Sequence, residues 1–162
     1  KLVIAAAGPV RRQLVTQLPA GLDLPDGFGP AALCLPGVLA IKGPPSGQER
    51  GESDPLIEDF CRFYDQRDIS DGIPLVVICD DSLFTAATLN NFLWVTFTRS
   101  NPATDVYGIK AESRGHHWGC RGPLVIDARV KPFHAPGLES DPEVERRVDA
   151  LGAKGGPLHG II

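Results

Sequence analysis

The segment that most constrains the fold is the run PLVVIC at residues 74–79. It is apolar without alternation, so both faces of the strand that it forms must be covered, as in the middle of a parallel sheet. A sheet covered in this way has helices packed on its faces. The run therefore points to an α/β domain.

Strand and helix patterns alternate along most of the chain. Apolar runs predict strands at 2–7, 74–79, 105–109 and 123–126, and the prolines and glycines from 19 to 53 predict a loop-rich stretch with one or two short strands at the apolar runs 31–35 and 37–41. Apolar spacing, capping aspartates and prolines at helix starts predict helices from Pro9 to Leu18 and over 55–67, 83–99 and 142–152. With 162 residues in all, this order predicts one domain over residues 1–162, a layered α/β/α fold with a mostly parallel sheet.

Composition excludes several classes of protein. The net charge of −4 provides no basic surface, so neither nucleic acid nor an anionic membrane is an expected partner. No apolar run approaches the roughly 20 residues of a membrane span. The cysteines lie far apart without a Cys-x-x-Cys pair, so we expect reduced, mostly buried thiols and a cytoplasmic protein: Cys34, Cys61, Cys79 and Cys120. Because the chain begins at Lys1 and contains no methionine, we treat it as a piece of a longer protein.

Two acidic residues follow the strongest predicted strand. Ligands of α/β sheets lie beyond the carboxyl ends of strands, so Asp80 and Asp81 could hold Mg²⁺ or a ribose. The alternative is that Asp81 or Ser82 caps the following helix while Asp80 is solvated. Capping is the favoured interpretation.

A polar loop before the last predicted strand gathers side chains that can carry chemistry. With two later residues it contains ligand types of a zinc or iron site: His116, His117, Cys120, Asp127 and His134. The spacing argues against a metal, because adjacent histidines diverge on an extended backbone and no second cysteine completes a tetrahedral set. The loop could instead line a substrate pocket, with Trp118 as an apolar wall, or be packed structure with solvated histidines. Both interpretations stay open.

The helix predicted at 83–99 is apolar on more than one side. Leu89, Leu93 and Phe97 form its main stripe, and Trp94 and Val95 fall outside it. Trp94 and Val95 therefore predict a second contact surface, facing another domain or subunit, with core packing as the alternative.

Three blocks in the second half of the chain carry a family resemblance. The first is VVICDD at 76–81, and the second is a T-R-x-x-P-x-x-D segment formed by Thr98, Arg99, Pro102 and Asp105. The third is a D-A-x-x-K-P segment formed by Asp127, Ala128, Lys131 and Pro132. Together they resemble the C-terminal domain of UbiD-family decarboxylases over about residues 70–162, and the tail at 134–162 is similar to one branch of that family.

The resemblance implies a reversible, non-oxidative decarboxylase of aromatic or α,β-unsaturated carboxylic acids that uses prenylated FMN with a divalent metal and potassium. In that family the cofactor and a Glu-Arg-Glu catalytic set belong to a preceding split-barrel domain, and no position of this chain matches the set. We therefore expect no catalytic residue, no metal and no bound cofactor in this chain, and an inactive isolated domain. The expected partners are that flavin-binding domain, further copies in a homo-oligomer, and a small carboxylic acid.

By the same resemblance, this domain contributes oligomer contacts and one wall of the substrate cleft. The wall would be the loop with Ile109, His116, His117 and Trp118, and it would set substrate specificity rather than rate. Two other functions remain as alternatives: a purely structural oligomerisation module, and a stand-alone α/β metal- or nucleotide-binding protein that uses Asp80, Asp81 and the histidines.

Overall fold

Strand β3 (Leu75–Cys79) lies at the middle of a five-stranded sheet. The structure is a computed structural model that describes residues 8–10, 12–69, 71–137 and 141–161. In it β3 pairs in parallel with β2 (Val38–Lys42) on one side and with β7 (Leu124–Asp127) on the other. The residues from Val76 to Cys79 are buried. The strand that the apolar run predicts, covered on both faces, is therefore confirmed.

The two outer strands of this sheet run antiparallel to their neighbours. β1 (Ala31–Leu35) pairs with β2, and β4 (Val106–Gly108) pairs with β7. The α/β class is confirmed, but the sheet is mixed and not mostly parallel. The reason lies in the connections: β1 and β2 are joined by a tight turn at Pro36 and Gly37, where Gly37 has φ 73°, and such a short connection can join only antiparallel strands.

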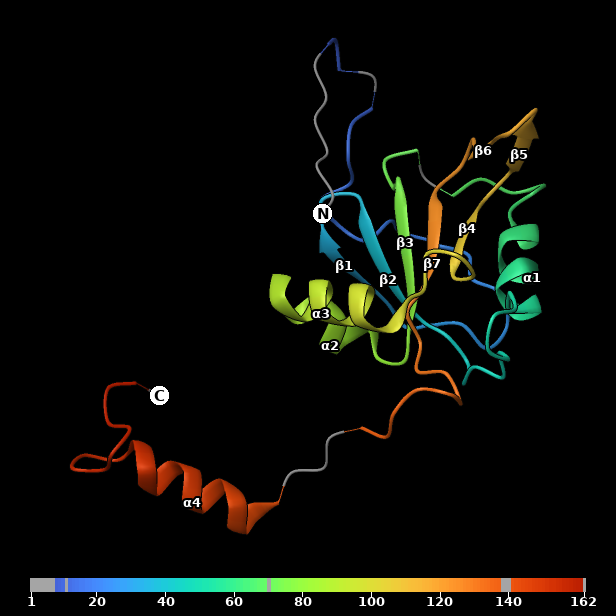
Figure 1. Ribbon diagram of the computed structural model, residues 1–162. Helices are drawn as coiled ribbons and strands as arrows, with labels where there is room; N and C mark the ends of the chain where they lie inside the picture. The colour runs from blue at the N-terminus through green and yellow to red at the C-terminus, as the bar shows by residue number, and fades with distance from the viewer. Residues whose placement is uncertain (1–7, 11, 70, 138–140, 162) are drawn as a thin grey trace.

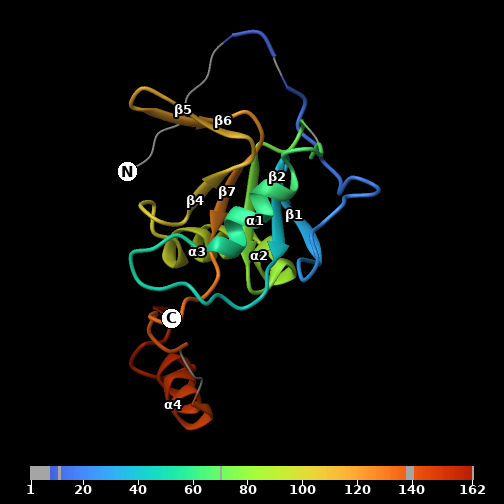
Figure 2. The same ribbon diagram turned by 90° about the vertical axis from the view of Figure 1, so that its right-hand side faces the viewer.

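Helices pack on both faces of the sheet (Figures 1 and 2). Alternate residues of a strand point to opposite faces. Leu39 and Val76 accordingly lie in one buried cluster, together with Phe60 of α1 (Pro55–Phe63). Ala40 and Val77 lie in the other cluster, together with Phe92 and Val95 of α3 (Leu89–Arg99).

Helix α1 begins where the sequence predicts. The Asp54 carboxylate accepts the Leu56 N–H at 2.9 Å, and Pro55 occupies the first turn. The helix ends at Phe63 and not at residue 67. Tyr64 follows as its C-cap, with a buried ring whose hydroxyl donates to the Asp23 carbonyl at 2.6 Å.

The single helix predicted at 83–99 is two helices. α2 (Ser82–Ala87) stops before Thr88, and α3 starts after it. Thr88 has an extended backbone, and its hydroxyl oxygen accepts the Asn91 N–H at 3.0 Å. Thr88 can cap α3 only with this extended backbone, and an extended residue cannot continue α2. The cap therefore explains the break between the two helices.

Neither of the two elements predicted for the first 18 residues is confirmed. The strand at 2–7 lies outside the described residues. The helix from Pro9 to Leu18 is wrong, because its described residues form no regular element. Val15 instead donates to the Gly72 carbonyl at 3.1 Å and accepts the Gly37 N–H at 2.9 Å. The segment is thus held across one end of the sheet, and Val10, 90% exposed, has no core to face.

The polar loop of the sequence analysis is a β-hairpin. β5 (Ala111–Arg114) and β6 (His117–Cys120) pair antiparallel through a turn in which Gly115 has φ 62°. Its strands lack the apolar alternation that predicts a hairpin from sequence.

Helix α4 (Pro142–Gly152) forms as predicted, with Asp141 accepting the Glu143 N–H at 2.8 Å. It buries none of its residues and lies away from the sheet (Figures 1 and 2). Within the described parts of the chain, neither α4 nor any other helix is long and apolar enough to cross a membrane.

Candidate functional site

Five charged side chains gather inside the domain, where the carboxyl end of β7 meets the starts of α1 and β4. Each residue is less than 5% exposed. We call this set the ionic cluster: Asp54, Asp105, Asp127, Arg129 and Lys131. Buried charges are costly unless they are paired, so the geometry of the pairs decides what the cluster can do.

Arg129 is the centre of the ionic cluster. Its Nη2 lies 2.6 Å from Asp54 Oδ2, and its Nε lies 2.8 Å from Asp127 Oδ1. Its Nη1 donates to the Pro44 carbonyl at 2.8 Å. Burial opposes the charged guanidinium, but Asp127 and Asp54 outweigh that effect and raise the pKa of Arg129. The side chain is held on three sides and is permanently charged.

Lys131 and Asp105 form the second half of the ionic cluster. Lys131 Nζ lies 3.2 Å from Asp105 Oδ2 and donates to the carbonyls of Asp127 and Arg99. Asp105 also accepts from the Asn101 N–H and the Gln48 amide. Burial alone would raise the pKa of Asp105, but these donors and Lys131 prevail and hold that pKa below its ordinary value.

The four charged residues of the family motifs thus have ion-pair partners within the fold. Asp105, Asp127 and Lys131 belong to the ionic cluster, and Arg99 pairs with Asp80 at 2.8 Å. Of the uncharged motif residues, Thr98 and Pro102 lie on the surface: the Thr98 hydroxyl donates to the Trp94 carbonyl of its own helix, and Pro102 lies in an exposed turn. The motif builds the domain and leaves no free reactive group in the ionic cluster.

Arg129 was missed by sequence reasoning, although a signal was present. Residues 127, 129 and 131 alternate, and alternate residues of an extended segment point the same way. An arginine between an aspartate and a lysine at that spacing belongs to the same buried face.

The two aspartates after β3 have structural roles. Asp81 accepts the Phe84 N–H at 2.9 Å and caps α2, which confirms the favoured interpretation. Asp80 accepts from Arg99 and from the Val130 N–H at 2.9 Å, so it is bonded rather than simply solvated. Both carboxylates are thus engaged within the fold.

The predicted cleft residues separate into three environments. Ile109 is 1% exposed and belongs to the core, whereas His116 and His117 are exposed at the hairpin tip. Trp118 is 49% exposed. It lines a shallow pocket of about 370 Å³, which we call the Trp118 pocket, together with residues of α1 and β4 that include Cys61, Arg62 and Tyr107.

Gly108 explains how the hairpin approaches β4 beside the Trp118 pocket. A Cβ atom on Gly108 would lie 2.5 Å from Cys120 Cβ and 3.3 Å from the Trp118 ring. Only glycine leaves room for this contact. The position of Trp118 therefore depends on a residue of the neighbouring strand.

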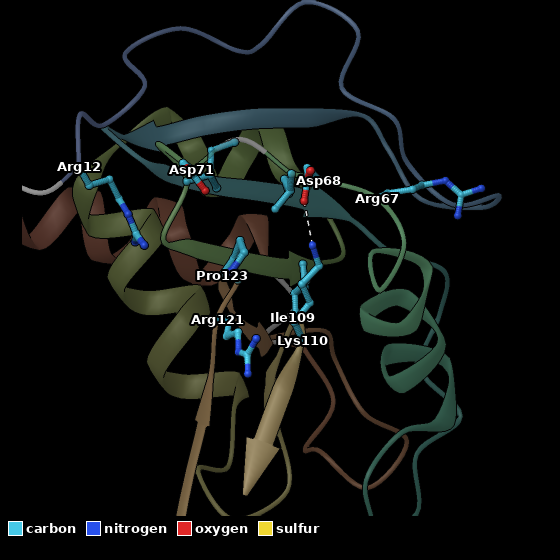
Figure 3. Close-up of a pocket in the computed structure, with 11 residues that line it drawn as sticks. Arg12, Arg67, Asp68, Asp71, Ile109, Lys110, Arg121 and Pro123 are labelled. Atoms are coloured by element: carbon cyan, nitrogen blue, oxygen red, sulfur yellow. Dashed lines mark hydrogen bonds and ion pairs between the residues drawn. The ribbon is translucent and has the colours of Figure 1, made fainter.

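A second cavity, of about 310 Å³, lies beside Ile109 (Figure 3). Figure 3 shows Lys110 pointing toward Asp68, which it contacts at 2.8 Å, and Arg67 pointing away from the cavity. Arg121 is paired with Glu112 at 2.9 Å. Lys110 and Arg121 are thus paired with carboxylates and Arg67 points away, so we do not assign this cavity a ligand.

The described residues contain no group of side chains suited to a metal ion: no three or more His, Cys, Asp or Glu among them could hold one. The carboxylates of the ionic cluster already face Arg129 and Lys131. His134 accepts the Lys131 N–H at 3.2 Å through Nδ1, and burial and Lys131 lower its pKa.

The residues expected at an interface have different environments. Val95 is 1% exposed and packs in the domain's own core, so it cannot meet a partner directly. Trp94 is 52% exposed, with the Arg99 guanidinium 5.0 Å from its ring centroid. We call Trp94 and its exposed apolar neighbours the α3 apolar face: Leu89, Leu93, Trp94 and Phe97.

Comparison with known proteins gives similarity over part of the chain, and no family model matches it. The chain is 35% identical over 75 residues to a 4-hydroxybenzoate decarboxylase subunit of Chlamydia pneumoniae. These 75 residues make up 46% of this chain and 13% of that protein. It is 35% identical over 77 residues to an uncharacterized protein of Chlamydia muridarum, again 13% of that protein's length. The chain therefore has weak similarity to a decarboxylase subunit and spans only a small part of these relatives.

Two solved structures of the vanillic acid decarboxylase of Sedimentibacter hydroxybenzoicus in open form also match. Their identities to this chain are 15% and 14%, with TM-scores of 0.38 and 0.39. The matches cover 71% and 72% of this chain and 26% of the matched chain in each case.

Proposed function

We propose that this chain is the C-terminal assembly and substrate-cleft domain of a UbiD-like decarboxylase that acts on aromatic or α,β-unsaturated carboxylic acids. The observation that carries the proposal is the 35% identity over 75 residues to the 4-hydroxybenzoate decarboxylase subunit. The reaction of the whole enzyme is part of the proposal, and so is the cytoplasmic location that its four free cysteines favour.

The use of the motif residues supports a scaffold role. Asp105, Asp127 and Lys131 satisfy one another inside the domain. A catalytic acid or base needs access to the reacting group, and these residues have none. We therefore place the chemistry outside the described residues, on a flavin-binding domain of the same enzyme that would hold prenylated FMN, a divalent metal and potassium.

The Trp118 pocket is the feature of this chain that we assign to the substrate cleft. A half-exposed indole offers a large, rigid apolar surface. In this proposal Trp118 contacts the part of the acid remote from its carboxylate, while His116 and His117 lie at the exposed hairpin tip and do not line the pocket. Contacts with a non-reacting part of the substrate orient it, and they discriminate between acids of different shape.

Two competing functions receive less support. A stand-alone metal- or nucleotide-binding protein would use Asp80 and Asp81, but both carboxylates are engaged within the fold. A purely structural oligomerisation module would leave Trp118 without a role in turnover, and substitution of Trp118 separates that case from ours.

The test is Trp118→Ala in the full-length enzyme, assayed with a series of aromatic acids by CO₂ release. We expect the ratio of kcat/KM between small and bulky acids to change roughly 10-fold or more, the usual scale for one apolar contact. Phe84→Ala, which removes a half-exposed aromatic ring from α2, is the matched control and should leave the ratio unchanged. An unaltered ratio in Trp118→Ala would remove the cleft assignment, and no decarboxylation of any acid by the flavin-loaded enzyme would remove the reaction.

A further inference from the structure

The connections that follow β2 and β3 leave the sheet toward opposite faces. The two strands are neighbours and run parallel. The chain after β2 leads to α1, which packs on the face that carries Leu39 and Val76. The chain after β3 leads to α2 and α3, and α3 packs on the face that carries Ala40 and Val77. In open α/β sheets such a reversal opens a crevice at the carboxyl ends of the two strands, and ligands bind there.

The structure has a hollow of about 490 Å³ at this place, which we call the β2–β3 crevice. In Figure 1 the carboxyl ends of β2, β3 and β7 lie at the lower end of the sheet, and the β5–β6 hairpin lies at the upper end. The crevice is therefore at the opposite end of the sheet from the hairpin that carries Trp118. Its lining comes from the ends of these three strands and includes Lys42, Pro45, Asp80, Val130, Lys131 and Pro132.

The floor of the β2–β3 crevice is held by close backbone contacts. The Gly43 N–H donates to the Cys79 carbonyl at 2.9 Å, which ties the chain after β2 to the end of β3. A Cβ atom on Gly43 would lie 2.6 Å from Ile78 Cγ2 and 3.0 Å from Arg129 Cδ. Only glycine allows this approach. The crevice is therefore part of the rigid frame of the sheet.

One charged group of the β2–β3 crevice remains for a ligand. Asp80 pairs with Arg99 at 2.8 Å, and the buried Lys131 ammonium faces Asp105 at 3.2 Å. The Lys42 side chain is exposed, and its ammonium forms no ion pair or hydrogen bond with any residue in the described part of the chain. The ammonium of Lys42 is thus available to an anion that enters the crevice.

The remaining walls of the crevice are mainly apolar. They include the rings of Pro45 and Pro132 and the side chain of Val130, which is 46% exposed. Ligand pockets combine apolar walls of this kind with a few well-placed polar groups. A single ammonium balances one negative charge, whereas a dianion would bring a second charge close to Asp80 without a partner. The crevice therefore suits a monocarboxylate better than a phosphate monoester.

We propose that the β2–β3 crevice binds a small monocarboxylate with an apolar body. The carboxylate pairs with the Lys42 ammonium, and the apolar body lies against Pro45, Val130 and Pro132. None of these four residues has a part in the substrate cleft assigned above. The inference goes beyond the proposed function and does not rest on it.

Protection of Lys42 from acetylation tests the proposal in the full-length protein. Succinimidyl acetate modifies exposed lysines, and mass spectrometry of peptides gives the rate at each one. Benzoate at about 10 mM, with a Kd on the order of 1 mM, should slow the modification of Lys42 roughly 10-fold, because only the unbound fraction reacts. Lys154, which is exposed near the C-terminus, is the reference in the same molecule and should react at an unchanged rate.

Two related compounds separate the charge from the ring. Benzamide has the ring without the charge, and acetate has the charge without the ring, so each should protect Lys42 at least 3-fold less than benzoate does. Val130→Ser removes part of the apolar wall and should weaken protection by benzoate about 3-fold or more. Val144→Ser, at a valine of α4 that is 50% exposed, is the matched control and should leave the protection unchanged.

Four results would overturn the proposal. The first is no protection of Lys42 by benzoate, and the second is equal protection by benzamide or acetate. The third is an equal effect of Val130→Ser and Val144→Ser. The fourth is loss of the protection in Trp118→Ala, which would assign benzoate to the Trp118 pocket. Acetylation requires no turnover, so its outcome is separate from that of the decarboxylation assay.

Discussion

Arg129 and Asp54 lie 75 positions apart in sequence, yet Nη2 of the first donates to Oδ2 of the second at 2.6 Å inside the domain. The other oxygen of Asp54 caps α1 through the Leu56 N–H. One carboxylate thus joins the start of α1 to the segment after β7. The contact fixes a helix on one face of the sheet relative to the central strands.

Replacing Arg129 by Met should destabilise the domain strongly. The substitution leaves Asp54 and Asp127 buried without their counter-ion, a loss of about 3–5 kcal/mol in the free energy of unfolding. Urea denaturation measures it. Arg121→Met, which breaks an exposed pair with Glu112, should cost less than about 1 kcal/mol. Equal costs for the two variants would show that the ionic cluster does not hold the fold.

Stability should fall in acid through Asp105. Its pKa is lower in the folded chain than its ordinary value of 3.8. The stabilisation is therefore complete above pH 3.8 and is lost as the pH falls through the lower folded value. We expect the free energy of unfolding, measured by urea titration at a series of pH values, to decline over that window.

Asp105→Asn is the control for the acid effect. It removes the charge that faces Lys131, so the variant should be less stable at pH 7. The slope of its free energy of unfolding against pH should also be smaller in acid, by up to about 1.4 kcal/mol per pH unit, which corresponds to one proton. If the stability of Asp105→Asn falls in acid as steeply as that of the parent chain, the pH dependence belongs to other carboxylates.

Gly108→Ala should displace the β5–β6 hairpin. The added methyl would meet Cys120 Cβ at 2.5 Å, and overpacking of this kind costs about 1–3 kcal/mol. Gly119→Ala lies in the same hairpin, and apart from its chain neighbours no atom lies within 4 Å of its new methyl. This variant should therefore leave the stability nearly unchanged. Tryptophan fluorescence, read with Trp94→Phe present in both variants, reports whether Trp118 moves. The prediction fails if the two variants behave alike.

The buried thiols should be unreactive in the native chain. Burial raises the pKa of Cys61 to about 12 and that of Cys79 to about 11. At pH 8 few thiolates form, so a disulfide reagent should modify these two cysteines roughly a hundred- to a thousandfold more slowly than an ordinary thiol. Unfolding in guanidinium should restore fast reaction of all four cysteines. Rapid modification of Cys61 in the folded chain would contradict its burial.

Much of the fold could be predicted because local patterns encode it directly. The strand at 74–79 shows its burial through continuous apolar residues, and Asp54-Pro55 and Asp141-Pro142 mark helix starts through side chains that act within one turn. The direction of β1 and β4 depends on how connections route the chain. The break at Thr88 depends on which of two competing hydrogen bonds wins.

The candidate site was harder to predict than the fold. Arg99, Asp105, Asp127 and Lys131 were identified as motif residues, but a motif does not reveal whether its charges face one another or a ligand. Arg129 went unnoticed because its partner Asp54 lies in a distant segment. Ile109 and Trp118, near in sequence, diverge because one belongs to the core and the other to a hairpin with its own pairing.

The arrangement of Asp54, Asp105, Asp127, Arg129 and Lys131 also limits how such a chain can diverge. Loss of any one member leaves an opposite charge with fewer partners in the interior, so single substitutions are poorly tolerated. Substitutions that compensate one another must therefore arise together. Sites at the hairpin tip carry no such mutual dependence. The hairpin tip can then change freely while the framework beneath it is inherited almost as one unit.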